Sequence, residues 1–350
     1  MSSDGPREAP SGDGPAIGLV LGGGGIAGYA FHCGVLAALD EIGFDPRTAS
    51  VVVGTSAGSI VAALLRGGVT APTIRDRLLA DLQDPDEMAR IRLLAGRSSR
   101  AVPRIWAGPG SPGLALAELR KGPGLRLTRL ATGLLPRGRL ELDPVSDPLN
   151  VLHGDRWPDR PLWIPATDLA SGRRTVFGQD HRPPVALAVA ASCALPGFFE
   201  PAEVDGRTYV DGGVDSPFNL DLLAEHRTTE GRPLDLVVVA APLSVKRIQP
   251  TSPLDAVARA LPRRRLRSEM RRITGSGIPV LALEPNRASA RAMGLNPMDY
   301  HGLDDIIERS AEMVDRRIDR LGPIVRAILE SADRLERPTT VPYPETAPLT

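Results

Sequence analysis

Cysteine and aromatic residues are scarce in this sequence, and long apolar runs are missing. Its two cysteines are Cys33 and Cys193, too few for a disulfide framework, so we expect a reducing compartment, namely the cytoplasm. Aromatic residues make up only 4%, which argues against platforms that stack on nucleic-acid bases. No run of about 18 apolar residues occurs, so no membrane-spanning helix is predicted. The first fifteen residues are polar and lack the apolar core of a signal peptide.

Neither sign of charge prevails in the chain. Its 42 lysines and arginines balance 42 aspartates and glutamates. A dedicated nucleic-acid-binding protein shows a basic excess, so we expect no nucleic-acid partner. The 350 residues suffice for one large α/β domain or two smaller ones. The sequence leaves the oligomeric state open.

A β-branched run at 51–53 leads directly into Gly54-Thr55-Ser56-Ala57-Gly58, and an Ala-rich apolar segment follows. This order predicts a strand, a tight turn and a helix over 57–66. Gly-x-Ser-x-Gly is the pattern of a nucleophile elbow, in which the glycines leave room for a strained turn. The Ser56 hydroxyl would then point out over the sheet, beside the positive end of the helix. The alternative is an ordinary strand-to-helix turn built from small residues.

Four glycines at 22–25 separate an apolar strand pattern at 16–21 from a helical pattern at 29–42. Free amides in such a loop can hold an anion, either the pyrophosphate of a dinucleotide or the oxyanion of an acyl-transfer reaction. Gly23, Gly25 and Gly28 fit the dinucleotide spacing, but no acidic residue closes the next strand about 20 residues on. Adjacent parallel strands would bring this loop and Ser56 to one edge of the sheet. Acyl transfer is therefore favoured, and no cofactor or metal is expected.

Ser56 needs a base, and Asp211 is the stronger candidate. It ends a strand pattern and precedes Gly212 and Gly213, so backbone amides of a tight turn can hold its carboxylate. Taken alone, this stretch favours a plain turn aspartate. None of the five histidines lies in a motif that suggests catalysis.

Three stretches together resemble the patatin-like phospholipase family: Gly23 to Gly28, Gly54 to Gly58, and Asp211-Gly212-Gly213. The segment from Ala191 to Phe199 also resembles the one that precedes the aspartate in that family. The resemblance implies a three-layer α/β/α fold with a mainly parallel central sheet. It also implies a Ser56–Asp211 dyad, with amides of Gly23, Gly24 and Gly25 lining the oxyanion hole, and Gly28, Gly54, Gly58, Gly212 and Gly213 as supporting motif residues.

The implied activity is hydrolysis of acyl esters of lipids, of the phospholipase A, lysophospholipase or lipid acyl hydrolase type. One position departs from the family pattern, since Ala27 stands where an arginine or lysine is usual. This change weakens the expectation of a phospholipid substrate more than that of hydrolase chemistry. Two alternatives stay open: a carboxylesterase with a Ser-Asp-His triad that uses His226 or His301, and a catalytically weak, lipid-binding family member.

Gly-, Pro- and Ser-rich stretches elsewhere in the chain predict its domain boundaries. We expect a disordered tail at 1–15, a catalytic domain at 16–225 with a helical insertion at 84–150, a continuation at 226–335 and a Pro-rich tail at 336–350. Further elements are expected as strands at 162–167, 174–177, 234–240 and 280–283, a hairpin at 203–210, and helices at 72–83, 185–192 and 303–335.

Seven arginines and one acid, Glu269, fall within 259–272. Such a segment suits peripheral contact with an anionic membrane surface. The alternative, a solvated helix balanced by acids elsewhere in the fold, is the favoured interpretation of this stretch alone.

Overall fold

The computed structural model describes residues 14–89, 111–120, 127–135, 138, 143–179, 181–245, 253–294, 296, 298–332 and 334–344. Most of the tail expected at 1–15 lies outside these residues. The strands are β1 (Ile17–Leu21), β2 (Val51–Gly54), β3 (Leu162–Asp168), β4 (Arg174–Phe177), β5 (Ala202–Val204), β6 (Arg207–Asp211), β7 (Leu236–Ala240) and β8 (Val280–Leu283).

Helices flank these strands, and short 3-10 turns join some of the elements. The helices are α1 (Gly25–Glu41), α2 (Ala57–Arg66), α3 (Ala71–Gln83), α5 (Pro112–Leu119), α6 (Leu127–Leu134), α7 (Asp143–His153), α8 (Val185–Cys193), α9 (Pro253–Gly275), α10 (Arg287–Ala292), α11 (Leu303–Ile318) and α12 (Pro323–Ala332). The 3-10 turns are η1 (Pro46–Thr48), η4 (Gly212–Val214) and η5 (Leu220–Leu223).

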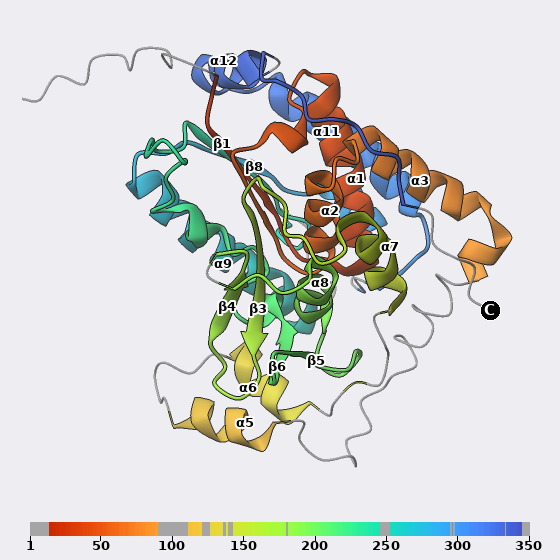
Figure 1. The fold of residues 1–350 in the computed structure, drawn as a ribbon, viewed down its shortest axis with the longest axis vertical. Helices are drawn as coiled ribbons and strands as arrows, with labels where there is room; N and C mark the ends of the chain where they lie inside the picture. The colour runs from red at the N-terminus through yellow and green to blue at the C-terminus, as the bar shows by residue number, and fades with distance from the viewer. Residues whose placement is uncertain are drawn as a thin grey trace, which may run out of the picture.

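One mainly parallel sheet forms the centre of the molecule (Figure 1). Its strands lie in the order β5-β6-β3-β2-β1-β7-β8, and β4 pairs with β3 outside this path. The pairs β3–β2, β2–β1, β1–β7 and β7–β8 are parallel, whereas β4, β5 and β6 join antiparallel. The expected mainly parallel α/β sheet is therefore confirmed.

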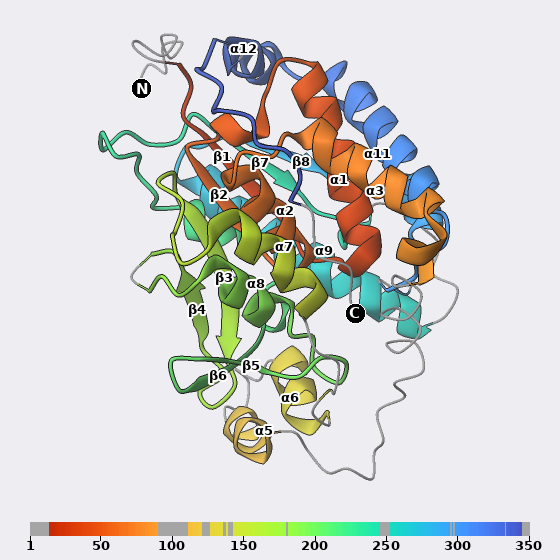
Figure 2. The same ribbon diagram turned by 45° about the vertical axis from the view of Figure 1, so that its right-hand side comes forward.

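Side chains along each strand point alternately to the two faces of the sheet, and each face has its own hydrophobic core. In β1, Ile17, Leu19 and Leu21 pack into one core with α1, α2 and α11. Val20 faces the opposite core, which contains Leu266 and Ile273 of α9. Burial on both faces explains why β1 and β2 read as continuous apolar runs. Figures 1 and 2 show the resulting three layers, with α1, α2, α3 and α11 on one side and α9 on the other.

Two boundaries differ from the sequence expectation. The single helix expected over 303–335 is wrong, because α11 ends at Ile318 and α12 begins at Pro323. Proline lacks the N–H of a helical residue and disfavours helical geometry in the residue before it, here Gly322. Helix α1 begins at Gly25 rather than near Tyr29, so the glycine loop is shorter than expected.

The insertion expected over 84–150 contains helices α5, α6 and α7 in its described parts. Both views place α5 and α6 beyond the end of β3, away from the α1, α3 and α11 layer (Figures 1 and 2). Within the described ranges, no helix is long and apolar enough to cross a bilayer.

Candidate active site

Ser56 lies at the turn between β2 and α2, where the backbone is strained. Its dihedral angles are φ 52 and ψ −126, and a residue other than glycine adopts a positive φ of this kind only when its surroundings enforce it. The glycines on either side explain how the turn closes. A Cβ atom at Gly58 would lie 2.1 Å from the Leu21 carbonyl oxygen, and one at Gly54 would lie 2.6 Å from the Gly58 oxygen.

Asp211 ends β6 and is held by the turn that follows. The amide of Gly213 donates to its Oδ1 atom at 2.7 Å, and its own amide donates to the Ala194 carbonyl at 3.0 Å. Its side chain is buried, with 3% of the residue exposed. Gly212 is required because a Cβ atom there would lie 2.3 Å from the Pro165 carbonyl oxygen.

The side chains of Ser56 and Asp211 meet at the carboxyl edge of the sheet. Burial raises the pKa of the Asp211 carboxyl to about 6, while hydrogen bonds from the Gly213 amide and the Ser56 hydroxyl oppose the rise. Cys193 lies beside this pair. Its thiol shares a hydrogen bond with Ser56, and its Sγ atom lies 3.7 Å from the Ser59 hydroxyl. Burial, reinforced by the charge of Asp211, raises the pKa of that thiol, so it stays protonated and unreactive.

The glycine loop lies directly against the serine. A Cβ atom at Gly23 would sit 3.3 Å from the Cβ of Ser56. The Gly23 amide, however, donates to the Pro217 carbonyl at 2.8 Å, so this amide is occupied. Gly24 and Gly25 are the cap and first residue of α1, where backbone amides have no acceptor inside the helix. The amides at the start of α1 are therefore the ones in this loop that lack an acceptor within the helix.

The sequence model of the patatin-like phospholipase family matches residues 19–224, more than half of the 350-residue chain. The chain belongs to the patatin-like phospholipase family. Membership supports a lipid acyl hydrolase in general terms, and the matched range contains Ser56, Asp211 and the glycine loop.

Similar proteins include a Mycobacterium tuberculosis protein described as an uncharacterized NTE family protein, which is 31% identical over 210 residues. The match covers 60% of this chain and 46% of that protein, so this chain spans about half the length of its mycobacterial relative. YqhO, an uncharacterized protein of Bacillus subtilis, is 30% identical over 226 residues, covering 59% of this chain and 67% of its own. The crystal structure of VipD from Legionella pneumophila aligns with a TM-score of 0.41 and 14% identity, over 88% of this chain and 67% of that one.

The patatin-like chain also uses supporting residues that the sequence motifs do not reveal. Ser192 accepts a hydrogen bond from the Ser56 amide at 3.0 Å and donates to the Pro165 carbonyl at 2.7 Å. It thereby links the Ser56 turn to the start of the Asp211 turn, since Pro165 also lies against Gly212. The only sequence signal for this role is a hydroxyl within the otherwise apolar pattern of 185–193, because a buried hydroxyl needs a partner.

Asn219 holds Thr55, the residue before Ser56. It adopts a left-handed conformation with φ 53, and its side-chain amide donates to the Thr55 hydroxyl at 3.0 Å and to the Ser216 carbonyl at 2.6 Å. Both partners are buried. No local pattern in the sequence predicts this contact, because Asn219 and Thr55 are far apart along the chain.

Each of the five histidines, all of them described, has its contacts away from the Ser56–Asp211 pair. His226 packs edge-on against Trp163, with ring centroids 4.9 Å apart, and His301 pairs with Asp299 at 2.7 Å. His153 bonds to the Ala63 carbonyl, and His181 pairs with Asp205. These contacts give the triad alternative no support.

His32 contacts the glycine loop from inside the core. Its Nε2 atom lies 2.7 Å from the Gly22 carbonyl oxygen. Because a carbonyl only accepts, Nε2 carries the proton and donates. Burial lowers the pKa of His32 to about 4, so the ring is neutral and fixes the loop rather than transferring protons.

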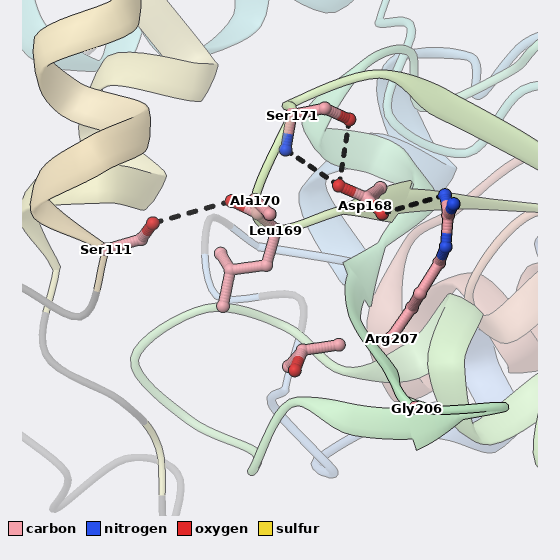
Figure 3. Close-up of a pocket in the computed structure, with 8 residues that line it drawn as sticks. Ser111, Asp168, Leu169, Ala170, Ser171, Gly206 and Arg207 are labelled. Atoms are coloured by element: carbon pink, nitrogen blue, oxygen red, sulfur yellow. Dashed lines mark hydrogen bonds and ion pairs between the residues drawn. The ribbon is translucent and has the colours of Figure 1, made fainter.

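A separate hollow lies between the start of α5 and the β3–β4 and β5–β6 turns (Figure 3). Its lining includes Ser111, Asp168 and Arg207 but neither Ser56 nor Asp211. The amide and hydroxyl of Ser171 both donate to Asp168, at 2.7 and 2.8 Å. This carboxylate therefore stabilises the turn.

Proposed function

We propose that this chain is a serine hydrolase that cleaves acyl esters of lipids, with Ser56 as nucleophile and Asp211 as its base. One observation carries the proposal: a buried, hydrogen-bonded carboxylate faces the hydroxyl of a serine held in a strained turn. Family membership supports the lipid acyl hydrolase part. The dyad, the serine-dependent mechanism and the phospholipase A or lysophospholipase subtype are our inferences.

In the proposed mechanism, Asp211 accepts the Ser56 proton while the serine oxygen attacks the ester carbonyl. With a pKa of about 6, Asp211 is ionised near neutral pH and is more basic than an exposed aspartate. The tetrahedral intermediate expels the alcohol, which leaves with the proton held by Asp211. Water then attacks the acyl-enzyme, Asp211 accepts a proton from it, and the fatty acid is released as Ser56 recovers its proton.

Negative charge on the carbonyl oxygen would be stabilised at the start of α1. The amides of Gly24 and Gly25 and the positive end of the helix lie there, and one such donor contributes about 3 kcal/mol to the transition state. Gly23 contributes space rather than a donor, since its amide is occupied. Ala27, buried in the first turn of α1, adds no positive charge, so backbone dipoles alone provide this stabilisation.

The test combines covalent labelling with turnover. A fluorophosphonate probe should label the wild-type chain and fail to label Ser56→Ala, and hydrolysis of a nitrophenyl ester should fall at least about 1,000-fold in Ser56→Ala and Asp211→Asn. Ser171→Ala, which alters a serine in the separate hollow, is the matched control and should match wild type. Equal activity of wild type and Ser56→Ala would refute the assignment. A panel of lipid esters then identifies the headgroup and acyl-chain preference.

Two alternatives have distinct outcomes. A Ser-Asp-His triad requires activity to collapse in His226→Asn or His301→Asn, whereas the dyad leaves both unchanged. A lipid-binding member without catalysis would bind lipid but show neither labelling nor turnover. A cytoplasmic location, expected from two free, buried cysteines, belongs to the proposal as well.

A further inference from the structure

Helices α5 and α6 lie against each other and form a pair beyond the carboxyl end of β3 (Figure 2). The amide of Ser111, at the start of α5, donates to the carbonyl of Gly133, at the end of α6, at 3.1 Å. The helices pack closely, because a Cβ atom at Gly133 would lie 2.6 Å from the Ala115 nitrogen. The two helices thus pack directly on each other, and the pair has buried and solvent-exposed side chains.

The inner face of the pair is attached to the segment that carries Asp211. Leu114 packs in a small cluster with Leu169, Val210 and Val214. The Thr128 hydroxyl donates to the Val214 carbonyl at 2.8 Å. Because Val210 and Val214 flank Asp211 closely in sequence, this unit is fixed beside the candidate catalytic aspartate.

The outer face of the pair exposes leucines. Leu116 and Leu119 on α5 are 49% and 57% exposed, and Leu134 on α6 is 56% exposed. Within the described ranges, six large apolar side chains are at least 41% exposed, and three of them lie on this pair. Apolar side chains gathered on one small element mark an interaction surface rather than a random scatter.

The charge of this stretch selects the partner. Residues 112–139 include six arginines and lysines but one acid, Glu118. Glu118 is buried and faces Arg129 at 3.7 Å, so it does not offset the other cations. Arg120, next to Leu119, is exposed. Exposed leucines beside an exposed arginine, in a stretch whose sequence is basic, are the combination that binds an interface of acyl chains and anionic headgroups.

We propose that the outer face of the α5–α6 pair docks on an anionic lipid bilayer and seats the Ser56–Asp211 site against it. The leucines enter the headgroup region, and Arg120 contacts the lipid phosphates. The role of this docking in catalysis depends on the proposed lipid hydrolase function. Membrane binding by the pair does not depend on it.

The arginine-rich helix α9 is the competing surface, and its contacts make it the weaker one. Arg265 pairs with Glu269 at 2.6 Å, and Arg272 faces Asp221 at 3.5 Å. These pairs match the interpretation of a helix balanced by acids elsewhere in the fold. Arg264 and Arg271 remain exposed and provide matched charge controls for Arg120.

The first experiment measures co-sedimentation with vesicles of phosphatidylcholine plus phosphatidylglycerol, compared with phosphatidylcholine alone. The wild-type chain should bind the anionic vesicles, and added salt should weaken binding. The triple variant Leu116→Asn, Leu119→Asn, Leu134→Asn should bind the anionic vesicles at least about tenfold more weakly than the wild-type chain. Ile324→Asn, at a 72% exposed position of α12, should bind like wild type. Unchanged urea midpoints verify folding, because all four positions are exposed.

The second experiment separates the two charged surfaces. Arg120→Gln should reduce binding to the anionic vesicles about fivefold, whereas Arg264→Gln and Arg271→Gln should leave it unchanged. The opposite pattern would assign docking to α9 and overturn the proposal. Wild-type vesicle binding by the triple leucine variant would overturn the proposal too. So would light scattering that shows the wild-type chain dimerising with rising concentration while the triple leucine variant stays monomeric.

Hydrolysis of a soluble nitrophenyl ester distinguishes failure of docking from failure of the proposed function. The triple leucine variant should keep wild-type rates on the soluble ester and lose activity only on vesicles. A chain that binds anionic vesicles but hydrolyses no ester would overturn the function and leave docking intact. A chain that hydrolyses the soluble ester but ignores vesicles would overturn docking alone.

Discussion

Ser56 has a positive φ of 52, and the side chain of an L-amino acid is sterically crowded in that conformation. Conformations of this kind cost on the order of 1–3 kcal/mol unless the residue is glycine. The turn holds the serine there through its backbone, because its amide donates to the Ser192 hydroxyl and its carbonyl accepts from the amide and the hydroxyl of Ser59. The strain is therefore a property of the site that a substitution can release.

We predict that Ser56→Gly is inactive but more stable than wild type, by about 1 kcal/mol in the free energy of unfolding, because glycine adopts φ 52 without strain. Ser56→Ala is equally inactive but gains no such stability, since alanine retains a Cβ atom. Urea unfolding of the three proteins measures the difference. Equal midpoints for the glycine and alanine variants would mean that the turn is unstrained.

Asp211 makes the protein less stable as pH rises, whereas a salt-bridged aspartate makes a protein more stable as pH rises. Burial raises its pKa from 3.8 to about 6, so the native state keeps a proton that the unfolded chain has already released. The free energy of unfolding therefore falls as pH rises through this window. Above it the ionised, buried carboxylate destabilises the fold by about 3 kcal/mol at most, and the same ionisation makes the residue a base.

We predict that Asp211→Asn abolishes activity and is more stable than wild type above the window, with the gain disappearing as pH falls toward 3.8. The wild-type rate should rise with pH through a midpoint near 6, the pKa of Asp211. Urea midpoints and nitrophenyl ester rates measured across pH check both statements. A stability difference independent of pH would contradict the linkage.

At the scale of elements, a buried ion network attaches α6 to the turn that follows Asp211. Arg129 of α6 approaches Asp215 at 2.6 Å, and Arg174 and Arg265 approach the same carboxylate at 3.6 and 3.7 Å. Asp215 is the residue after η4. The arginine from the insertion therefore holds the segment that positions Asp211.

We predict that Arg129→Met lowers the free energy of unfolding by about 3 kcal/mol, because the change removes one partner from a buried charge cluster. Ester hydrolysis should also decrease, since the Asp211 turn loses its contact with α6. Arg264→Met, at an exposed position of α9, is the control and should change stability by no more than about 0.5 kcal/mol. Wild-type stability and activity in Arg129→Met would show that the network does not hold the turn.

Elements with strong local signals were predictable from the sequence. β4 spans 174–177 and β8 spans 280–283 as expected, and α2 follows the elbow over 57–66. The Asp205-Gly206 turn joins β5 to β6 with positive φ at both residues, which is the geometry that such a pair favours. These signals depend on neighbouring residues, which the sequence displays directly.

Features that depend on distant contacts were not predictable. The break at Pro323 was missed because the amphipathic pattern continues across it. The occupied Gly23 amide depends on the Pro217 carbonyl, and the support of Ser56 by Ser192 depends on the packing of α8. Motif order brought Ser56, Asp211 and the loop together, while the residues that fix their geometry required the folded chain.

At the scale of the whole molecule, the Pro-rich segment expected as a tail packs along the helical layer in its described part, 336–344. The Val341 amide donates to the Gly68 carbonyl at 3.1 Å, and Arg47 donates to the Thr340 hydroxyl at 3.2 Å. The ring of Tyr343 lies under Arg77, 5.5 Å from its guanidinium carbon, and shares a hydrogen bond with Tyr29 of α1. The segment thus joins the residues after α2 to α3 and α1.

We predict that removing residues 336–350 lowers the free energy of unfolding by about 3 kcal/mol, because Tyr343 loses its burial and several backbone and side-chain hydrogen bonds are lost. Removing only 345–350 is the matched control and should leave stability unchanged within about 0.5 kcal/mol. Tyr343→Ala in the full chain should reproduce part of the loss, since it removes the ring under Arg77 and the hydrogen bond with Tyr29. Urea unfolding of the four proteins decides the matter, and a truncated chain with the wild-type midpoint would mean that the segment only rests on the surface without stabilising it.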